Sequence, residues 1–283
     1  MKIPKRLEPL VEDGLIDYVI RPLMSGKEAA VFLVQCGSEI RCAKVYKEAA
    51  KRSFKQAVLY QEGRKVRNSR RSRAMEKGSK FGRNQQEEAW QNAEVDALYR
   101  LDAAGVRVPK PYGCFEGVLL MELVTDDGVA PRLNDVSMDA EQAIEDHATV
   151  MHYVKLMLCA GLVHGDLSEF NVLVDAYGPV IIDLPQAVDA AANNNARSML
   201  DRDVNNMTEY YGQYAPELLQ TRYAKEMWAL YEEGELTPDT ELTGHFEESD
   251  EAADVDSVVE EIKAVLAEER ARQERLREAE EED

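Results

Sequence analysis

The hydrophobic and polar positions along the chain change their spacing several times, and each change predicts a different element. Apolar residues at helical spacing predict a short helical lead-in over residues 1–24. Two apolar runs follow at residues 29–35 and 40–46, and the turn residues 36–39 between them predict a β-hairpin. Residues 87–104 carry apolar side chains at helical steps and predict an amphipathic helix. The first part of the chain is therefore expected to combine strands with one long helix.

Apolar positions become denser in the second half of the chain. After a strand-like run at residues 118–124, residues 147–160 contain enough apolar side chains for a helix that is buried on most sides. Two further runs, at residues 171–175 and 179–184, flank a short turn and predict a second hairpin. Helical spacing continues to about Tyr231. Strands with one helix, followed by helices with an embedded hairpin, predict an α+β fold.

Charge divides the chain into segments of opposite sign. The formal net charge of −20 argues against a nucleic-acid binder with a uniformly basic surface. Residues 64–83 nevertheless contain nine basic residues and one acidic residue, Glu76, whereas residues 246–283 contain 16 acidic and 5 basic residues. We expect the basic segment to form a flexible loop over residues 60–85, and the acidic end to be a solvated helix or a disordered arm.

The cysteines and the apolar segments bear on the compartment. Cys36, Cys42, Cys114 and Cys159 form no C-x-x-C pair and no dense disulfide pattern, which is typical of buried thiols in a reducing cytosol. The N-terminus lacks the apolar core of a signal peptide, and no stretch approaches the ~18 apolar residues of a membrane span. We therefore expect a cytoplasmic protein without a membrane partner.

The most specific chemical signal is the sequence LVHGDLSEFNVLVDAYGPVIIDLPQ, residues 162–186. It places Asp166, Asn171 and Asp183 on loops that border apolar strands. Protein kinases have an Asp and an Asn at the same five-residue step, followed by a hairpin and another Asp. Asp166 fits the catalytic base that orients an attacking hydroxyl, and Asn171 and Asp183 fit the oxygen ligands of Mg²⁺. The alternative explanation is that these are ordinary turn residues around a hairpin.

A lysine on a predicted strand supports the kinase interpretation. Lys44 lies in CAKVYK, where the kinase lysine contacts the α- and β-phosphates of ATP. Its acidic partner is expected on the following helix. Glu94 is our choice because it lies beside the apolar face of that helix, and Glu87 and Glu88 are alternatives near the helix start. A lysine on a strand is otherwise commonly a solvated edge residue.

The expected nucleotide loop departs from the glycine-rich loop of ordinary kinases. The sequence there is MSGKEAAVF, residues 24–32, with Gly26 as its single glycine. Backbone amides around Ser25, Gly26 and Lys27 are expected to line phosphate oxygens, and Lys27 adds a positive charge. Val31, on the strand that follows, is a further expected ATP contact. The segment is not a Walker A motif, because the run G-x-x-x-x-G-K-[ST] is absent.

Together these motifs resemble the RIO family of atypical protein kinases. SGKEAAVF is similar to the family's phosphate loop, CAKVYK to its ATP-lysine strand, LVHGDLSEFNVL to its catalytic loop and IIDLPQAVD to its metal-binding segment. The resemblance covers residues 16–231 and is to the RIO1-type branch, which has no N-terminal winged helix. It implies ATP and Mg²⁺ as cofactors, with Mn²⁺ as an alternative.

The resemblance also implies a fold and its boundaries. The expected α+β structure is a two-lobed, protein-kinase-like fold with a small β-rich N-lobe and a reduced, mostly helical C-lobe. After the lead-in, the N-lobe and hinge are expected over residues 25–124, the C-lobe over residues 125–232 and the acidic tail over residues 233–283.

Roles for further residues follow from the same resemblance. Met121, Glu122 and Leu123 would form the hinge whose backbone holds adenine. Asp166 would be catalytic, and Asp183 would be both a metal ligand and the acceptor of a transient aspartyl-phosphate. Because neither D-F-G nor A-P-E is present, the chain has little room for an activation loop and a peptide groove. We therefore expect a serine/threonine kinase that acts mainly as an ATPase or autokinase.

The resemblance and the basic segment also bear on partners and phosphate acceptors. In RIO proteins the basic loop can be autophosphorylated, which makes Ser69, Ser72 and Ser79 candidates, and its charge would suit RNA or ribosome precursors. Two alternatives stay open: a small-molecule phosphotransferase of the aminoglycoside or sugar type, and an ATP-gated assembly factor for RNA or the ribosome. The sequence does not indicate an oligomeric state.

Overall fold

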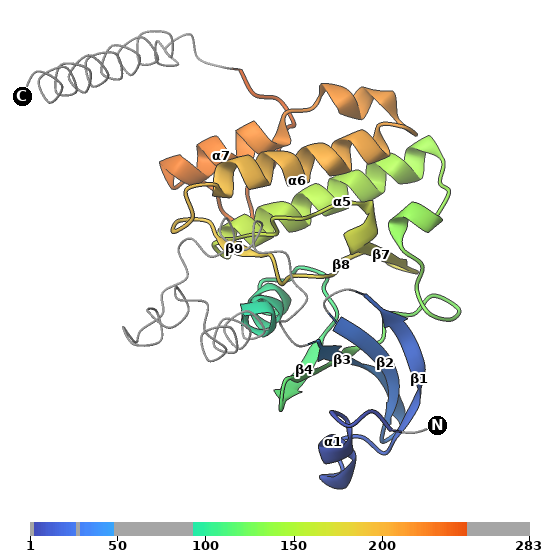
Figure 1. The fold of residues 1–283 in the computed structure, drawn as a ribbon. Helices are drawn as coiled ribbons and strands as arrows, with labels where there is room; N and C mark the ends of the chain where they lie inside the picture. Colours follow the sequence, from blue (N-terminus) through green and yellow to red (C-terminus); the bar gives the residue numbers. More distant parts are fainter. Residues whose placement is uncertain (1–2, 27–28, 48–92, 248–283) are drawn as a thin grey trace, which may run out of the picture. The chain divides into compact units, whose positions relative to one another are not determined.

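The structure, a computed structural model, describes residues 3–26, 29–47 and 93–247. By their internal contacts the residues divide into two units, 1–244 and 245–283, and the first unit holds the described helices and strands (Figure 1). Lys27, the alternatives Glu87 and Glu88, the loop expected at 60–85 with its three serines, and residues 248–283 lie outside the described residues.

A five-stranded antiparallel sheet forms the first part of this unit, in the order β1-β2-β3-β5-β4. Its strands are β1 (Tyr18–Ser25), β2 (Ala29–Cys36), β3 (Glu39–Tyr46), β4 (Pro111–Phe115) and β5 (Val118–Glu122). The hairpin expected around residues 36–39 is thereby confirmed, and the strand expected at 118–124 is present as β5. Gly37, with φ of 60°, adopts the left-handed conformation that the tight turn between β2 and β3 needs.

Alternation along the central strand separates the two faces of this sheet. Ala43 points to the face that packs against Leu7 and Leu10 of the N-terminal segment. Cys42 and Tyr46 are buried on the opposite side, and Lys44 lies between them at the same two-residue period. Lys44 pairs in register with Val31 and Leu119, so it occupies the middle of the sheet rather than an edge.

The helical lead-in predicted for residues 1–24 is wrong for most of its length. Helix α1 covers only Glu8–Glu12, and the edge strand β1 begins at Tyr18. Gly14 has φ of 72° and interrupts the helix, and the following residues Tyr18, Val19 and Ile20 favour an extended conformation. The apolar positions were nevertheless correct, because Leu7 and Leu10 are buried under the sheet.

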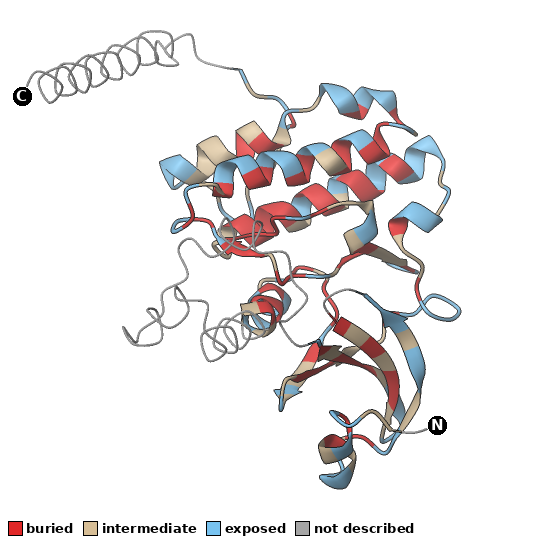
Figure 2. Cartoon of the chain, in the orientation of Figure 1, coloured by how far each residue is buried: buried red, intermediate tan, exposed pale blue. Residues whose placement is uncertain are grey.

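Helices dominate the second part of the unit. They are α5 (Ala140–Cys159), α6 (Ala196–Tyr211) and α7 (Tyr223–Glu233), with the 3₁₀ turns η2 (Leu133–Asp135), η3 (Glu169–Asn171) and η4 (Pro216–Gln220). Figure 2 shows buried residues along both α5 and α6, and these residues belong to one hydrophobic core. Asp139 caps α5 by accepting a hydrogen bond from Gln142 N, so this helix begins earlier than the predicted residue 147.

Short strands connect these helices to the sheet. The predicted hairpin at residues 171–184 is present as β7 (Val172–Asp175) and β8 (Gly178–Ile181). A second pair, β6 (Leu162–Val163) with β9 (Val188–Asp189), has too little sequence pattern to be predicted. The described residues thus form an α+β, two-lobed, kinase-like fold, as expected.

The compact unit extends beyond residue 232, where the C-lobe was expected to end. Leu236 and Leu242 pack against the helical core, and Glu226 accepts hydrogen bonds from Thr243 N and Gly244 N, both 2.8 Å long. Lys155 Nζ donates to Thr240 O over 2.6 Å. Residues 235–244 are therefore part of the folded unit. Although most of this segment is polar, its two leucines pack against the helices.

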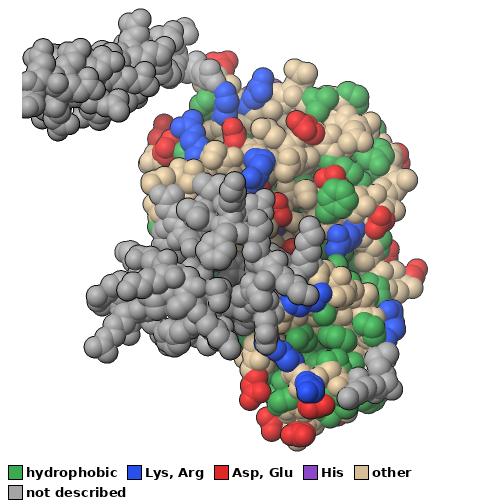
Figure 3. Space-filling view, viewed as in Figure 1, with side chains coloured by type: hydrophobic (Ala, Val, Ile, Leu, Met, Phe, Trp, Pro, Cys, Tyr) green, Lys and Arg blue, Asp and Glu red, His purple; other side chains and the backbone are tan. Residues whose placement is uncertain are grey.

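Two further features are the distribution of charged side chains on the surface and the hydropathy of the helices. On the face in Figure 3, Lys and Arg side chains of the described part are interspersed with Asp and Glu. Among the residues that the structure describes, no helix is both long enough and apolar enough to cross a membrane.

A buried histidine provides a test of the helical packing. His147 is 1% exposed, its Nε2 lies 3.0 Å from Thr208 Oγ1, and burial lowers its pKa from 6.5 to about 4. The unfolded chain therefore binds this proton near pH 6.5, whereas the folded chain binds it only near pH 4. The free energy of unfolding is expected to decrease by about 3 kcal/mol as the pH falls through this window.

Urea unfolding at pH 7, 5.5 and 4.5 measures this effect. His147→Gln should lose the His147 contribution and show a shallower decline than the unsubstituted protein, while His152→Gln, at an exposed position on the same helix, should change the slope less. Equal slopes for His147→Gln and the unsubstituted protein would contradict the expected titration.

Candidate active site

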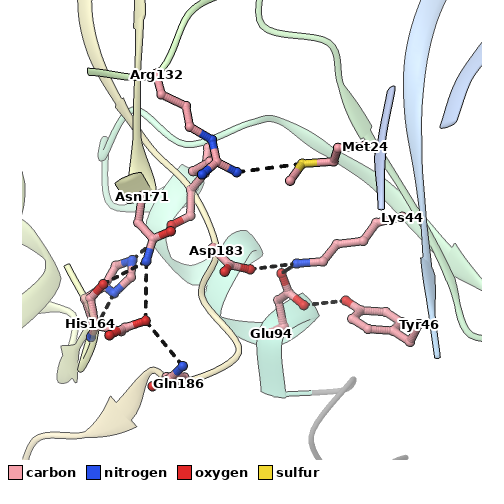
Figure 4. A network of polar contacts seen from close by, with 11 residues as sticks. Met24, Lys44, Tyr46, Glu94, Arg132, His164, Asn171, Asp183 and Gln186 are labelled. Atoms are coloured by element: carbon pink, nitrogen blue, oxygen red, sulfur yellow. Dashed lines mark hydrogen bonds and ion pairs between the residues drawn. The ribbon is translucent and has the colours of Figure 1, made fainter. Parts of the chain in front are cut away.

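Lys44 is held between two carboxylates that come from distant parts of the chain. Its Nζ lies 2.5 Å from Glu94 Oε1 and 3.0 Å from Asp183 Oδ1, and Asp183 is 139 residues further along the sequence (Figure 4). Burial works against the charged form of Lys44, but Glu94 and Asp183 outweigh it and raise its pKa, so this side chain carries a proton at neutral pH. The geometry thus fixes a positive charge beside Asp183.

Glu94 reaches this position because of the helix that carries it. Residues 93–103 are helical, and Glu94 shares one face with three buried apolar residues, Ala97, Leu98 and Leu101. Glu94 itself is 2% exposed. Glu94, our choice from the sequence, therefore lies next to Lys44 in the structure.

A tyrosine, to which the sequence assigned no role, completes this ion-pair cluster. Tyr46 OH donates a hydrogen bond to Glu94 Oε2 over 2.5 Å, and its side chain is buried. Burial and the Glu94 carboxylate raise the pKa of the Tyr46 phenol, which stays protonated and able to donate. Both Glu94 oxygens are thus occupied, one by Lys44 and one by Tyr46, which fixes the orientation of the carboxylate.

The predicted catalytic loop runs from β6 through η3 to β7 and is anchored by one buried carboxylate. Asp203, on α6, accepts hydrogen bonds from Gly165 N over 2.7 Å and from Leu167 N over 3.0 Å. Asn206 donates to Leu167 O over 2.9 Å, and Arg202 donates to Gly165 O. These contacts from α6 hold the backbone on both sides of Asp166.

Asp166 itself is exposed, and two amide side chains lie next to it. Asn171 Nδ2 donates to Asp166 O over 2.8 Å, and Gln186 Nε2 donates to Asp166 Oδ2 over 3.3 Å. Partial desolvation raises the pKa of the Asp166 carboxyl, against the opposing influence of His164 and Arg202. A carboxylate in this setting can accept a proton from a hydroxyl that approaches from solvent.

Asp183 stands in a strained conformation at the end of the hairpin. Its φ is 66°, in the left-handed region that residues other than glycine seldom adopt. Its side chain keeps 45% of its accessible surface, although Oδ1 is paired with Lys44. Burial opposes ionisation, but the Lys44 ammonium outweighs it and holds the pKa of the Asp183 carboxyl below its usual range. The carboxylate is therefore charged and open on one side.

The donor set at this point fits Mg²⁺. Asn171 uses its Nδ2 for Asp166, which leaves the amide oxygen as the atom that can bind a cation, and Asp183 offers a charged oxygen. Within the described ranges, no three His, Cys, Asp or Glu residues converge as a complete metal site. One carboxylate and one amide suit Mg²⁺ in nucleotide sites, where phosphate oxygens and water supply the remaining ligands.

The predicted phosphate loop is described up to Gly26. Ser25 and Gly26 are exposed at the end of β1, and Gly26 N donates to Ala29 O over 2.9 Å. Lys47 Nζ donates to Ser25 Oγ over 2.9 Å and to Gly26 O over 2.6 Å. Lys47 was not singled out from the sequence, although it belongs to the same motif as Lys44.

The predicted hinge lies beside an apolar cluster on the Lys44 face of the sheet. Met121 and Leu123 pack, together with Val31, against a cluster that contains Leu33 and Cys42. The Glu122 side chain instead forms a two-pronged ion pair with Arg107, both contacts 2.8 Å long. The structure therefore groups Val31 with Met121 and Leu123, while the Glu122 carboxylate is paired with Arg107.

Comparisons with known proteins show which family this chain is similar to. The family model described as the RIO domain matches residues 30–224. The RIO-type serine/threonine-protein kinase Rio1 of Haloferax volcanii is 38% identical over 71% of this chain and 66% of its own length. The serine/threonine-protein kinase RIO1 of Homo sapiens is 29% identical over 74% of this chain. The match spans 36% of the human protein, so much of that relative has no counterpart in the alignment.

Proposed function

The chain belongs to the RIO family, and we propose that it is a serine/threonine kinase that binds Mg-ATP and acts mainly as an ATPase and autokinase. The observation that carries this proposal is the position of Lys44 (Figure 4). The buried Glu94 holds the Lys44 ammonium 3.0 Å from Asp183, near Asn171, whose amide contacts Asp166. A fixed cation beside an open carboxylate and an amide oxygen is the arrangement that a polyphosphate with a divalent cation requires.

Each residue has a proposed task. Lys44 holds α- and β-phosphate oxygens, and the backbone at Ser25 and Gly26, with Lys27, covers the phosphates. The backbone of residues 121–123 and the side chain of Val31 hold the adenine. Asp183 and Asn171 hold Mg²⁺, or Mn²⁺ in its place, which neutralises charge on the transferred phosphoryl group.

Asp166 is proposed as the base. It accepts the proton of the attacking hydroxyl or water, while the Asn171 amide holds its backbone carbonyl and the Gln186 amide donates to its carboxylate. Asp183 is proposed as an additional acceptor: one of its oxygens bonds to the γ-phosphorus, the bond to the ADP oxygen breaks, and water later cleaves the aspartyl-phosphate to free phosphate.

The short connection after Asp183 supports ATPase and autokinase activity over broad protein phosphorylation. Residues 184–195 lead from Asp183 through β9 directly to α6. Leu184, Pro185 and Ala187 in this connection are buried, so the segment belongs to the core. A conventional kinase places its activation loop and peptide-binding surface at this point.

Partners are proposed from sequence and family alone. The nine basic residues between 64 and 83 would bind RNA or a ribosome precursor through phosphates, and Ser69, Ser72 and Ser79 would accept phosphate in the same segment. Cys36, Cys42, Cys114 and Cys159 are free thiols, which supports the proposed cytoplasmic location.

The fate of the γ-phosphate tests the proposal. Purified protein is incubated with γ-labelled ATP and Mg²⁺, and the label is measured as released phosphate and as label on the chain. We expect both to depend on Mg²⁺ and to fall by about 100-fold or more in Asp166→Ala. Label that hydroxylamine removes indicates an aspartyl-phosphate, and acid-stable label indicates phosphoserine. ATP bound without release or label would contradict the ATPase and autokinase proposal and favour a separate small-molecule acceptor or an assembly factor gated by binding alone.

A further inference from the structure

Arg132 extends toward the site from a segment that the catalytic motifs do not include. It follows the hinge, forms an isolated bridge with Leu173 of β7 and immediately precedes η2. Its Nη2 lies 3.8 Å from Met24 Sδ at the end of β1 (Figure 4). The side chain therefore spans from the floor of the site, beside Asn171, to the strand that leads into the phosphate loop.

The contact that Arg132 makes is a weak one for a charged guanidinium. Among the described residues Arg132 forms no ion pair, although Asp126, Asp127 and Asp135 are close in sequence and exposed. Within the described residues, its side-chain hydrogen bond is to a thioether, which is a weak acceptor. The residue is half-buried, and a partly desolvated guanidinium without an acceptor is unfavourable unless another group compensates.

The position of the Arg132 guanidinium relative to Asp183 and Lys44 is seen in Figure 4. Figure 4 shows the guanidinium on the Asn171 side of Asp183, whereas Lys44 approaches Asp183 from the sheet. Two cations thus flank the position at which the proposed function places the phosphates.

We propose that Arg132 is a phosphate-binding residue that donates hydrogen bonds from its guanidinium to the phosphate chain of the bound nucleotide. The inference rests on the proposed function and extends it by one residue, which lies outside the motifs that resemble those of the RIO family. A guanidinium offers paired N–H donors that match phosphate oxygens, so a phosphate replaces a weak sulfur contact by charge-assisted hydrogen bonds. When Arg132 binds phosphate, its contact with Met24 would be lost, and the end of β1 would no longer be held by Arg132.

Nucleotides of decreasing phosphate content test the inference. Affinities for Mg-ATP, Mg-ADP and adenosine are measured by calorimetry at constant ionic strength for the unsubstituted protein, Arg132→Met and Arg132→Lys. Arg132→Met should bind Mg-ATP about 10- to 100-fold more weakly and adenosine with unchanged affinity. The affinity of Arg132→Lys for Mg-ATP should lie between those of the unsubstituted protein and Arg132→Met, since lysine keeps the charge and loses the paired donors. Arg21→Gln removes a charge from an exposed position on β1 and should leave all three affinities within about twofold.

The results separate this inference from the function on which it depends. If the unsubstituted protein binds none of the three ligands, the proposed function itself is overturned. If it binds Mg-ATP and Arg132→Met binds it equally well, Arg132 does not contact phosphate. A parallel loss for adenosine and ATP would also overturn the inference, because the residue would then serve the sugar, the base or the fold. Arg132→Lys, which preserves the length and charge of the side chain, decides the matter if Arg132→Met unfolds.

Discussion

Asp183→Asn is expected to lower the rate of γ-phosphate release and transfer by about 1000-fold while leaving the protein folded. The substitution keeps the size of the side chain and removes the charge that pairs with Lys44 and is proposed to hold Mg²⁺. Loss of several kcal/mol of transition-state stabilisation corresponds to a rate effect of this order. Asparagine is the appropriate replacement because it tolerates the left-handed backbone at φ of 66°, whereas alanine would add strain.

Single-turnover rates at several Mg²⁺ concentrations measure this prediction. The Mg²⁺ concentration for half-maximal rate should increase in Asp183→Asn, and the midpoint of urea unfolding should stay close to that of the unsubstituted protein. Asp201→Asn, at an exposed position on α6, removes the same charge away from the site and should retain the normal rate. An Asp183→Asn protein with the normal rate and Mg²⁺ dependence would contradict the role given to this carboxylate.

Glu94→Ala is expected to reduce the free energy of unfolding by about 3 kcal/mol and to reduce turnover strongly. Lys44 and Glu94 are 8% and 2% exposed, so removal of the carboxylate leaves a buried ammonium with Asp183 as its remaining partner. The Tyr46 hydroxyl loses its acceptor at the same time. Removing one partner of a buried ion pair costs about 3–5 kcal/mol. Because Lys44 keeps Asp183 as a partner, we expect an effect at the lower end of this range.

A double variant separates stability from catalysis in this cluster. Lys44→Met combined with Glu94→Gln removes both charges, fills similar volume and leaves an amide oxygen to accept from Tyr46. Urea unfolding should show a stability within about 1 kcal/mol of the unsubstituted protein, because a neutral buried pair needs no compensating charge. Turnover should remain lost, since no cation would hold the phosphates. Recovery of turnover together with stability would show that Lys44 and Glu94 serve the fold alone.

Local patterns predicted the parts of the site that lie within short motifs. Asp166 and Asn171 are five residues apart and border a strand, and Lys44 follows the alternation of a central strand, so their proximity could be argued from the sequence. Glu94 was selected because it shares a helix face with buried residues, and the structure places it against Lys44. In each case the periodicity of one element determined where the side chain points.

Other contacts arise only when distant segments pack together. Asp203 lies on α6 and meets Gly165 and Leu167 across more than thirty residues, with no motif to mark it. Arg107 joins Glu122 to Asp175 of β7 through tertiary packing in the same way. The strand β1 was missed because a single helical turn precedes it, and the apolar spacing of that turn resembled a longer helix.

A crystal structure with Mg²⁺ and a non-hydrolysable ATP analogue tests most directly whether these residues form one nucleotide site. We expect Lys44 Nζ within hydrogen-bonding distance of an α- or β-phosphate oxygen while it still contacts Glu94. We also expect the metal to be bound by Asp183 and Asn171, and Asp166 to face the γ-phosphate without binding it. A nucleotide bound elsewhere on the protein, or phosphates that contact neither Lys44 nor the metal at Asp183, would contradict the account.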